Sequence, residues 1–210
     1  GAFSSNVHMK SGAPVFGTPE HIKTNFGAGQ LARHLGLPWR SGGGTASNCA
    51  DVQADYETQQ SVWSSVLAGA NLIYHSAGWL EGGLSFCFEK FINDIELLQT
   101  LAETMHPVPF SDDEIGLDAM AQVEPGGHFF ASPHTMDRYA TLHYEPVLSD
   151  WRNHGNWTEA GSVQTTDRAS AIWQKIDAEF VSPVQETADL GRAFEFLERR
   201  KAEGGSPAVS

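Results

Sequence analysis

The sequence predicts an α/β fold in which about three strands alternate with helices, followed by a mainly helical C-terminal region. Short apolar runs precede longer segments in which apolar residues recur every three or four positions, the spacing of one helix face. The connections between these segments are short. Such alternation indicates parallel strands joined by right-handed crossovers.

The clearest of these units spans residues 71–98. Asn71 to Tyr74 has the length and composition of a buried strand, and a polar, glycine-rich loop follows from His75 to Gly83. From Ser85 onward the apolar positions follow helical spacing as far as Ala102. In parallel α/β proteins the loop after the carboxyl end of a strand usually carries the chemistry.

A first strand and helix are predicted at the start of the chain. Phe3 to Met9 partly alternates, as a strand does. Thr18 as N-cap and Pro19 at the first helical position predict a helix that stops near Gly36. Its apolar residues on or near one face are Ile22, Phe26, Leu31 and Leu35.

A second strand is predicted at Leu37 to Arg40, although Pro38 cannot donate a hydrogen bond in a ladder. A flexible loop from Ser41 to Asn48 follows this strand. The next helix begins after Asp51, whose simplest role is to cap that helix.

Beyond residue 110 the pattern predicts helices alone. The expected helices run from Ser111 to Val123, His134 to Tyr144, Asp167 to Phe180 and Glu186 to Arg200. We therefore expect βα units in residues 1–110 and a helical extension in residues 111–210 that packs on them within one structural domain. Patterning alone allows either a small open α/β sheet or the C-terminal part of a (β/α)8 barrel.

Composition excludes several classes of protein. The formal net charge of −13 argues against nucleic-acid binding, which needs a basic patch to neutralise phosphates. No apolar run approaches the roughly 20 residues that span a bilayer, and no signal peptide is visible, so a cytoplasmic protein without a membrane segment is expected. Cys49 and Cys87 make neither a disulfide framework nor a zinc site, and the histidines show no metal-ligand spacing.

Several motifs, in order along nearly the whole chain, resemble the trimethylamine:corrinoid methyltransferase family. They are GAPVFGTPE (Gly12 to Glu20), GLPWRSGGG (Gly36 to Gly44), DVQADYE (Asp51 to Glu57), HSAGWLEGGLSFCFEKF (His75 to Phe91), HFFASPHTMDRY (His128 to Tyr139) and ERRKAEGG (Glu198 to Gly205). The resemblance implies a TIM barrel about twice this length. It favours the interpretation that this chain is the C-terminal part of a (β/α)8 barrel, with about three βα units and a helical tail.

The resemblance also implies an activity. The family transfers a methyl group from a methylated amine to the reduced cobalt of a corrinoid carried by a separate small protein. Members that act on trimethylamine carry pyrrolysine in the loop corresponding to residues 42–47, where this chain has Gly43, Gly44 and Thr45. The chain is thus more similar to members without pyrrolysine, which demethylate quaternary amines such as glycine betaine. A quaternary nitrogen is already an activated leaving group and needs no extra electrophile.

A quaternary cation calls for aromatic faces in its site, and a carboxylate is a further group that would favour it. Trp79 and Trp39 are the aromatic candidates, with ordinary packing as the alternative. His75, at the carboxyl end of a strand, is a candidate for hydrogen bonding to a substrate carboxylate or for a place near the corrinoid. Glu81 in the same loop is a candidate to face the cation, against the alternative of a solvated loop residue.

Further candidates lie around the second strand. Arg40 suits bidentate binding of a betaine carboxylate, with a salt bridge to Asp51 or Glu57 as the alternative. Gln53 and Tyr56 begin the next helix and are candidates to line the pocket. Farther along, Phe86, Phe88 and Phe91 are predicted to be core, and Glu89 and Lys90 a surface pair.

One broader alternative and one expectation about assembly follow from these observations. Instead of an enzyme, the chain could be a non-catalytic homologue that binds a quaternary amine or docks a partner. Incomplete barrels expose strand edges, so a homo-oligomer is expected.

Overall fold

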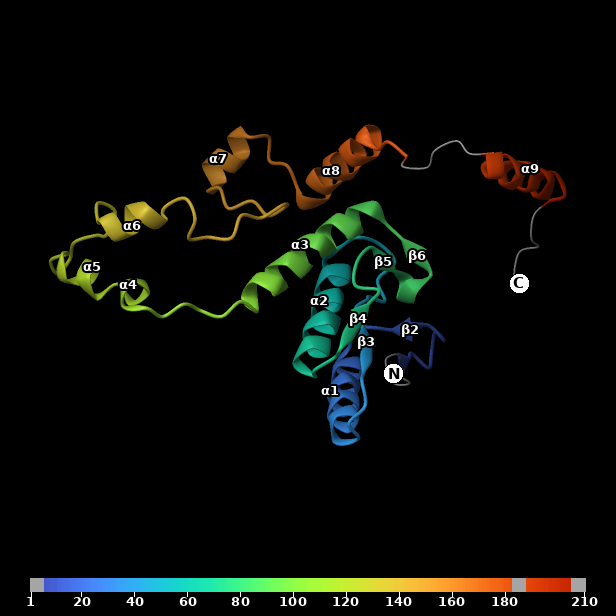
Figure 1. Cartoon of the computed structure of the whole chain (residues 1–210), viewed down its shortest axis with the longest axis horizontal. Coiled ribbons are helices and arrows are strands. Elements are labelled where there is room, and N and C mark those ends of the chain that lie inside the picture. The colour runs from blue at the N-terminus through green and yellow to red at the C-terminus, as the bar shows by residue number, and fades with distance from the viewer. Residues whose placement is uncertain (1–5, 183–187, 205–210) are drawn as a thin grey trace. The chain divides into compact units, whose positions relative to one another are not determined.

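The computed structural model describes residues 6–182 and 188–204, and the chain divides into two compact units after Gln174. The first unit contains a βαβ arrangement (Figure 1). Strand β3 (Arg40–Gly42) pairs in parallel with β4 (Leu72–Tyr74), and helix α2 (Val52–Leu67) connects them. This confirms the predicted α/β class.

Strand β3 begins where the predicted second strand ends. Its ladder starts with Arg40 opposite Leu72 and continues through the bond from the Gly43 amide to the Tyr74 carbonyl, at 2.9 Å. The predicted range, Leu37 to Arg40, was therefore shifted by about three residues. Pro38 has no N–H to offer a ladder, whereas the glycines after Arg40 do.

Three helices pack against one another beside this strand pair (Figure 1). Helix α1 (Pro19–His34) lies on α2, and α2 lies on α3 (Phe88–Thr104). The predicted caps are confirmed, since the side chains of Thr18 and Asp51 accept hydrogen bonds from the amides of His21 and Ala54.

The remaining strands of the first unit form two short antiparallel hairpins. Strand β1 (Asn6–Val7) pairs with β2 (Pro14–Val15), and β5 (Trp79–Leu80) pairs with β6 (Ser85–Phe86) around the 3₁₀ helix η1 (Glu81–Gly83). The first predicted strand, Phe3 to Met9, is thus part of a hairpin and not of the parallel sheet, and its first three residues lie outside the described residues. The barrel itself stays a prediction.

The layer beneath β3 is polar. The buried positions of α1 are His21, Asn25 and Gly29, whereas Leu31 and Leu35 of the predicted apolar face are 51% and 57% exposed. Ser41 of β3 hydrogen-bonds to Asn25 and Ser65 within this layer.

An apolar core forms elsewhere in the first unit. Ile92 of α3 packs with Leu148 and with Ala169, which belongs to α8 (Thr165–Glu179). Contrary to prediction, Phe86 and Phe88 are about half exposed, although their rings contact each other at 5.5 Å. Phe91 is also exposed, at 38%.

The C-terminal half is helical, as predicted, but with shorter elements. The other helices are α4 (Asp112–Ile115), α5 (Leu117–Ala121), α6 (Pro133–Arg138), α7 (His154–Glu159) and α9 (Ala188–Ala202). Gly116 adopts φ 70° and splits the predicted helix from Ser111 into α4 and α5. The predicted helix from His134 to Tyr144 ends at Arg138, α7 was not predicted, and Glu186 lies outside the described residues.

Among the described residues, no helix combines the length and apolar character needed to cross a membrane. The predicted boundary near residue 110 stays a prediction.

Candidate functional site

A cavity of about 270 Å³ lies at the carboxyl ends of β3 and β4. Aromatic rings and glycines line it, namely Phe16, Tyr74, His75, Trp79, Gly42, Gly43, Gly44, Gly82 and Gly83. We call it the aromatic–glycine pocket. It is the place where the sequence predicts chemistry, because the loops after adjacent parallel strands meet there.

Four rings form the aromatic part of the pocket. The His75 ring lies 4.0 Å from the Tyr74 ring and 4.6 Å from the Trp79 ring, measured between centroids. Phe16 arrives from the turn before α1, and its ring contacts buried His21 edge-on at 5.4 Å. Aromatic faces are negative, so this lining suits an organic cation.

The glycine part of the pocket has little room for side chains. A Cβ at Gly43 would lie 2.7 Å from Ser76 Oγ and from Val62 Cγ2, so this position requires glycine. A Cβ at Gly83 would approach the Trp79 ring to 3.3 Å, at a φ of 98°. The side of the pocket that these glycines form, which we call the glycine wall, therefore presents backbone atoms to a ligand.

The two glycine-bearing loops are bonded to each other. The Glu81 amide donates to the Ser47 carbonyl at 2.7 Å, and the Gly82 amide donates to the Thr45 carbonyl at 2.9 Å. The Glu57 carboxylate on α2 in turn accepts hydrogen bonds from the Thr45 hydroxyl at 2.5 Å and the Ala46 amide at 2.8 Å.

The loop that carries His75 and Trp79 is held from α3. The Gly78 amide donates to Asp94 at 2.8 Å, and Asp94 is paired with Lys90. Lys90 is fully buried and also bonds to Thr58, so the predicted surface pair with Glu89 is wrong. Burial raises the pKa of the Asp94 carboxyl to about 6, although Lys90 acts in the opposite direction.

The structure brings four predicted site residues to the pocket: His75, Trp79, Gly43 and Gly44. Thr45 lies behind the wall, where it is buried against Glu57. Glu81 is exposed in η1 at the pocket's edge, with its amide bonded to the opposite loop.

Arg40 lies beside the pocket without lining it. Its guanidinium carbon is 4.4 Å from the centroid of the Tyr74 ring, the same ring that lines the cavity. The structure does not show the alternative salt bridge from Arg40 to Asp51 or Glu57. Asp51 instead accepts a hydrogen bond from the Ala54 amide of α2, and Glu57 accepts one from the Thr45 hydroxyl.

Three predicted site residues lie away from the pocket. Trp39 is 7% exposed and its backbone bonds to Asn71 through both its amide and its carbonyl, which is a packing role. The Gln53 amide donates to Glu57 at 3.0 Å, and Tyr56 lies on the exposed side of α2.

Sequence reasoning missed Phe16 and Tyr74 as pocket residues. Tyr74 was assigned to the strand, yet its place as the last strand residue before His75 was a usable signal. Phe16 lies far from the other lining residues in sequence, and no local pattern indicated that its turn would cover them.

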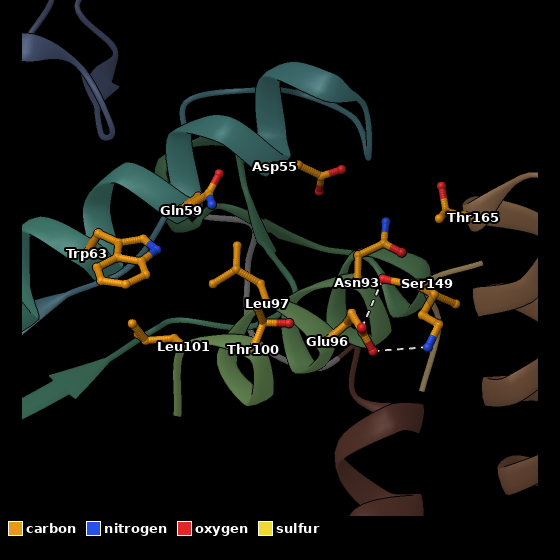
Figure 2. Close-up of a pocket in the computed structure, with 11 residues that line it drawn as sticks. Asp55, Gln59, Trp63, Asn93, Glu96, Leu97, Thr100, Leu101, Ser149 and Thr165 are labelled. Carbon is orange, nitrogen blue, oxygen red and sulfur yellow. Dashed lines mark hydrogen bonds between the residues drawn. The ribbon is translucent and has the colours of Figure 1, made fainter. Parts of the chain in front are cut away.

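A second hollow, of about 300 Å³, lies between α2 and α3 (Figure 2). Its Glu96 carboxylate accepts from the amides of Val147 and Leu148 and from the Ser149 hydroxyl, at 2.8–3.0 Å. These bonds attach the segment after residue 146 to α3. None of the predicted site residues lines this hollow. Among the described residues that line it, Trp63 alone carries an aromatic ring.

The chain is similar to known methyltransferases. The model of the family described as trimethylamine methyltransferase (MTTB) matches residues 1–205. Glycine betaine methyltransferase from Desulfitobacterium hafniense is 34% identical over 98% of this chain and 43% of its own length. Trimethylamine methyltransferase MttB from the same species is 30% identical over 90% of this chain and 40% of its own length.

A similar relative exists in an archaeon. Trimethylamine methyltransferase MttB from Methanosarcina thermophila is 28% identical over 84% of this chain and 36% of its own length. The chain thus spans less than half the length of the curated relatives it matches. Because the family model matches nearly all of it, the chain belongs to the trimethylamine methyltransferase family.

Proposed function

We propose that the protein containing this chain transfers a methyl group from a quaternary amine to the Co(I) of a corrinoid carried by a separate protein. The observation that carries the proposal is the lining of the aromatic–glycine pocket: four rings and glycine backbone, with no carboxylate, lysine or arginine among the described residues that line it. A quaternary ammonium group cannot donate a hydrogen bond, so aromatic faces are the protein surface best able to bind it.

The named relatives support the same class of substrate. One is a glycine betaine methyltransferase and others are trimethylamine methyltransferases. In this chain the glycine wall replaces the side chain that trimethylamine-specific relatives are expected to carry there. A quaternary substrate such as a betaine fits that difference, because its C–N bond is already activated.

We assign roles to the chain's own residues as follows. His75 and Trp79, whose rings contact each other at 4.6 Å, would together present one aromatic surface to the trimethylammonium group. Arg40, whose guanidinium lies over the Tyr74 ring, would receive a carboxylate that extends past the pocket's edge. Glu81 would face the same edge from η1.

The methyl acceptor would approach from outside the pocket. A cavity of about 270 Å³ is too small for a corrin ring together with a substrate, so the corrinoid would stay on its partner protein and supply the nucleophile. The chain's contribution would be to align the N–CH3 bond for in-line displacement. The leaving group is then the neutral tertiary amine.

The test uses the full-length protein with free cob(I)alamin and follows methylcobalamin formation by absorbance. The panel holds glycine betaine, carnitine, proline betaine, choline and trimethylamine. Turnover with one quaternary amine and none with trimethylamine is the expected result. A protein that binds none of them by calorimetry and leaves cob(I)alamin unmethylated would contradict the proposal.

Truncating the pocket's tryptophan should weaken substrate binding. We expect Trp79→Ala to raise the dissociation constant of the preferred amine about tenfold, since a desolvated cation–π contact contributes about 0.5–2 kcal/mol. Trp151→Ala is the matched control, because Trp151 is exposed and does not line the pocket. Equal affinities in the two variants, measured by calorimetry, would exclude Trp79 from the site.

The non-catalytic alternative makes a different prediction. A homologue that only binds a quaternary amine or docks a partner would bind a betaine without methylating cobalt, even with the cognate corrinoid protein present. Homo-oligomerisation and a cytoplasmic location stay predictions from the sequence.

A further inference from the structure

A buried carboxylate lies directly behind the aromatic–glycine pocket. Glu57, in the second turn of α2, is 6% exposed. Its Oε2 accepts from the Thr45 hydroxyl at 2.5 Å and the Ala46 amide at 2.8 Å, and its Oε1 accepts from the Gln53 amide at 3.0 Å. All three donors are neutral, so these hydrogen bonds satisfy the buried carboxyl oxygens without a cationic donor.

The backbone around Glu57 is closely packed. A Cβ at Gly17 would overlap the Cα and Cβ of Glu57, and Gly17 has a φ of 73°. The turn that delivers Phe16 to the pocket therefore rests on the same turn of α2. Glu57 cannot shift toward that turn, and its carboxylate is directed at the Thr45 loop.

From Thr45 the bonding continues to the opposite wall. The Thr45 carbonyl accepts from the Gly82 amide, and the Ser47 carbonyl accepts from the Glu81 amide. The Thr45 hydroxyl also accepts from the Ser47 amide at 2.9 Å, which fixes the local turn. One carboxylate thus bonds directly to Thr45 and Ala46, the residues that follow Gly43 and Gly44, and reaches Gly82 through one further hydrogen bond.

We propose that Glu57 is a positioning residue that sets the width of the aromatic–glycine pocket and so determines how tightly a methylated amine is held. It does not line the pocket and acts only through Thr45 and Ala46. The inference rests on the proposed function for its ligand, whereas the role of Glu57 in loop geometry can be measured without any ligand.

The experiment compares Glu57→Ala, Glu57→Gln and Ser64→Ala in the full chain. Glutamine keeps an oxygen that accepts from Thr45 and Ala46 and removes the charge, so it should preserve the geometry. Ser64 is the matched control, because it is buried in the same layer and bonds to Asn25 at 2.9 Å without touching either loop.

The expected effects differ between the variants. Glu57→Ala should raise the dissociation constant for glycine betaine about tenfold, the effect of losing two hydrogen bonds to a carboxylate that shape a site. In turnover the change should appear in KM more than in kcat. Glu57→Gln should bind within about threefold of the unmodified protein, and Ser64→Ala should bind as the unmodified protein does.

Hydrogen exchange supplies the readout that is independent of substrate. The amides of Ala46 and Gly82 should exchange faster in Glu57→Ala and stay protected in Ser64→Ala. If Glu57→Ala does not fold, Thr45→Val removes only the two bonds of the Thr45 hydroxyl, to Glu57 and from the Ser47 amide, and is expected to show the same pattern in weaker form.

The outcomes separate the two proposals. If the unmodified protein binds a betaine and Glu57→Ala binds it equally well, the positioning role is overturned. The same holds if Glu57→Gln loses as much affinity as Glu57→Ala, because the charge and not the geometry would then matter. If no methylated amine binds at all, the proposed function fails, and unchanged protection of Gly82 in Glu57→Ala would overturn the positioning role separately.

Discussion

At the scale of single residues, two side chains at the pocket sit on strained backbone. His75 has φ 57° and Glu81 has φ 53°, a region that costs a non-glycine residue about 1–3 kcal/mol. Both were chosen from the sequence as candidate catalytic residues. Sequence placed them in the correct loop but gave no sign of these dihedrals, which depend on the bonds that hold the loop to Ser47 and Asp94.

The Glu89 carboxylate should make stability depend on pH. Hydrogen bonds from the Ser170 hydroxyl, the Trp173 indole and the Cys87 thiol lower the pKa of Glu89 from 4.5 to about 2. Because the folded-state pKa is lowered, the stabilisation is present above pH 4.5 and is lost as the pH falls toward 2.

We therefore expect Glu89→Gln to lower the free energy of unfolding by about 1 kcal/mol at pH 7 and by less at pH 3. Urea denaturation at both pH values measures this difference. Glu103→Gln is the control, since Glu103 is exposed and pairs with exposed His106. A Glu89→Gln deficit that is the same at both pH values would show that the charge of Glu89 contributes nothing.

At the scale of elements, the caps and the buried faces of the helices differ in how well sequence predicts them. Thr18 and Asp51 were identified because a cap is a local pattern, and both are confirmed. The face of α1 was misassigned because apolar periodicity assumes an apolar core, whereas His21 and Asn25 make the buried face of α1 a hydrogen-bonded layer. The predicted helix boundaries after residue 110 were wrong where a single residue, Gly116, interrupts the helix.

A buried ion pair within α3 lies at the contact between α3 and α2. Lys90 pairs with Asp94, bonds to Thr58 at 3.1 Å and lies 3.9 Å from Asp55. Replacing Lys90 alone would leave the Asp94 carboxylate buried without its partner. Such a loss costs about 3–5 kcal/mol.

We expect Lys90→Met to destabilise the protein by that amount and the double variant Lys90→Met with Asp94→Asn to recover most of it. The asparagine keeps an acceptor for the Gly78 amide and removes the unpaired charge. Chemical denaturation of the single and double variants measures the recovery. Equal stability of the two would mean that the charge of Asp94 is not the cause.

At the scale of the whole molecule, apolar side chains are exposed at one end of the βαβ unit. The C-terminal turns of α1 and α2 touch where Gly29 approaches Ala68, and the leucines there are uncovered. They are Leu31, Leu35, Leu37, Leu67 and, at the start of β4, Leu72. Exposed apolar clusters of this kind mark interaction surfaces.

We expect the 210-residue chain to self-associate through this end, whereas the homo-oligomer predicted from the sequence rested on exposed strand edges. Sedimentation velocity should show species larger than a monomer, and Leu35→Glu with Leu67→Glu should shift them to monomer. Phe110→Glu, at another exposed apolar position, is the control. A monomer at all concentrations would remove the expectation.

The sequence predicted one part of the candidate site and missed another, and the two parts differ in how the chain brings their residues together. His75, Trp79 and the glycine wall follow strands that are neighbours in sequence as in space, so the alternation of strands and helices was enough to bring them together. Phe16 and the Glu57 anchor depend on how α1 and α2 pack, which one sequence does not specify. Gln53 and Tyr56 were misplaced for the same reason.

The glycine wall also determines at which position a new side chain could be introduced into this pocket. A side chain at Gly43 has no space, but a Cβ at Gly44 would meet only the Phe16 ring, at an ordinary 3.7 Å. Gly44 is therefore an attachment point that is open on the cavity side, where a cysteine could carry a chemical label or a reactive group into the pocket. A side chain could be added at Gly44 without a change in the backbone conformation of the glycine wall.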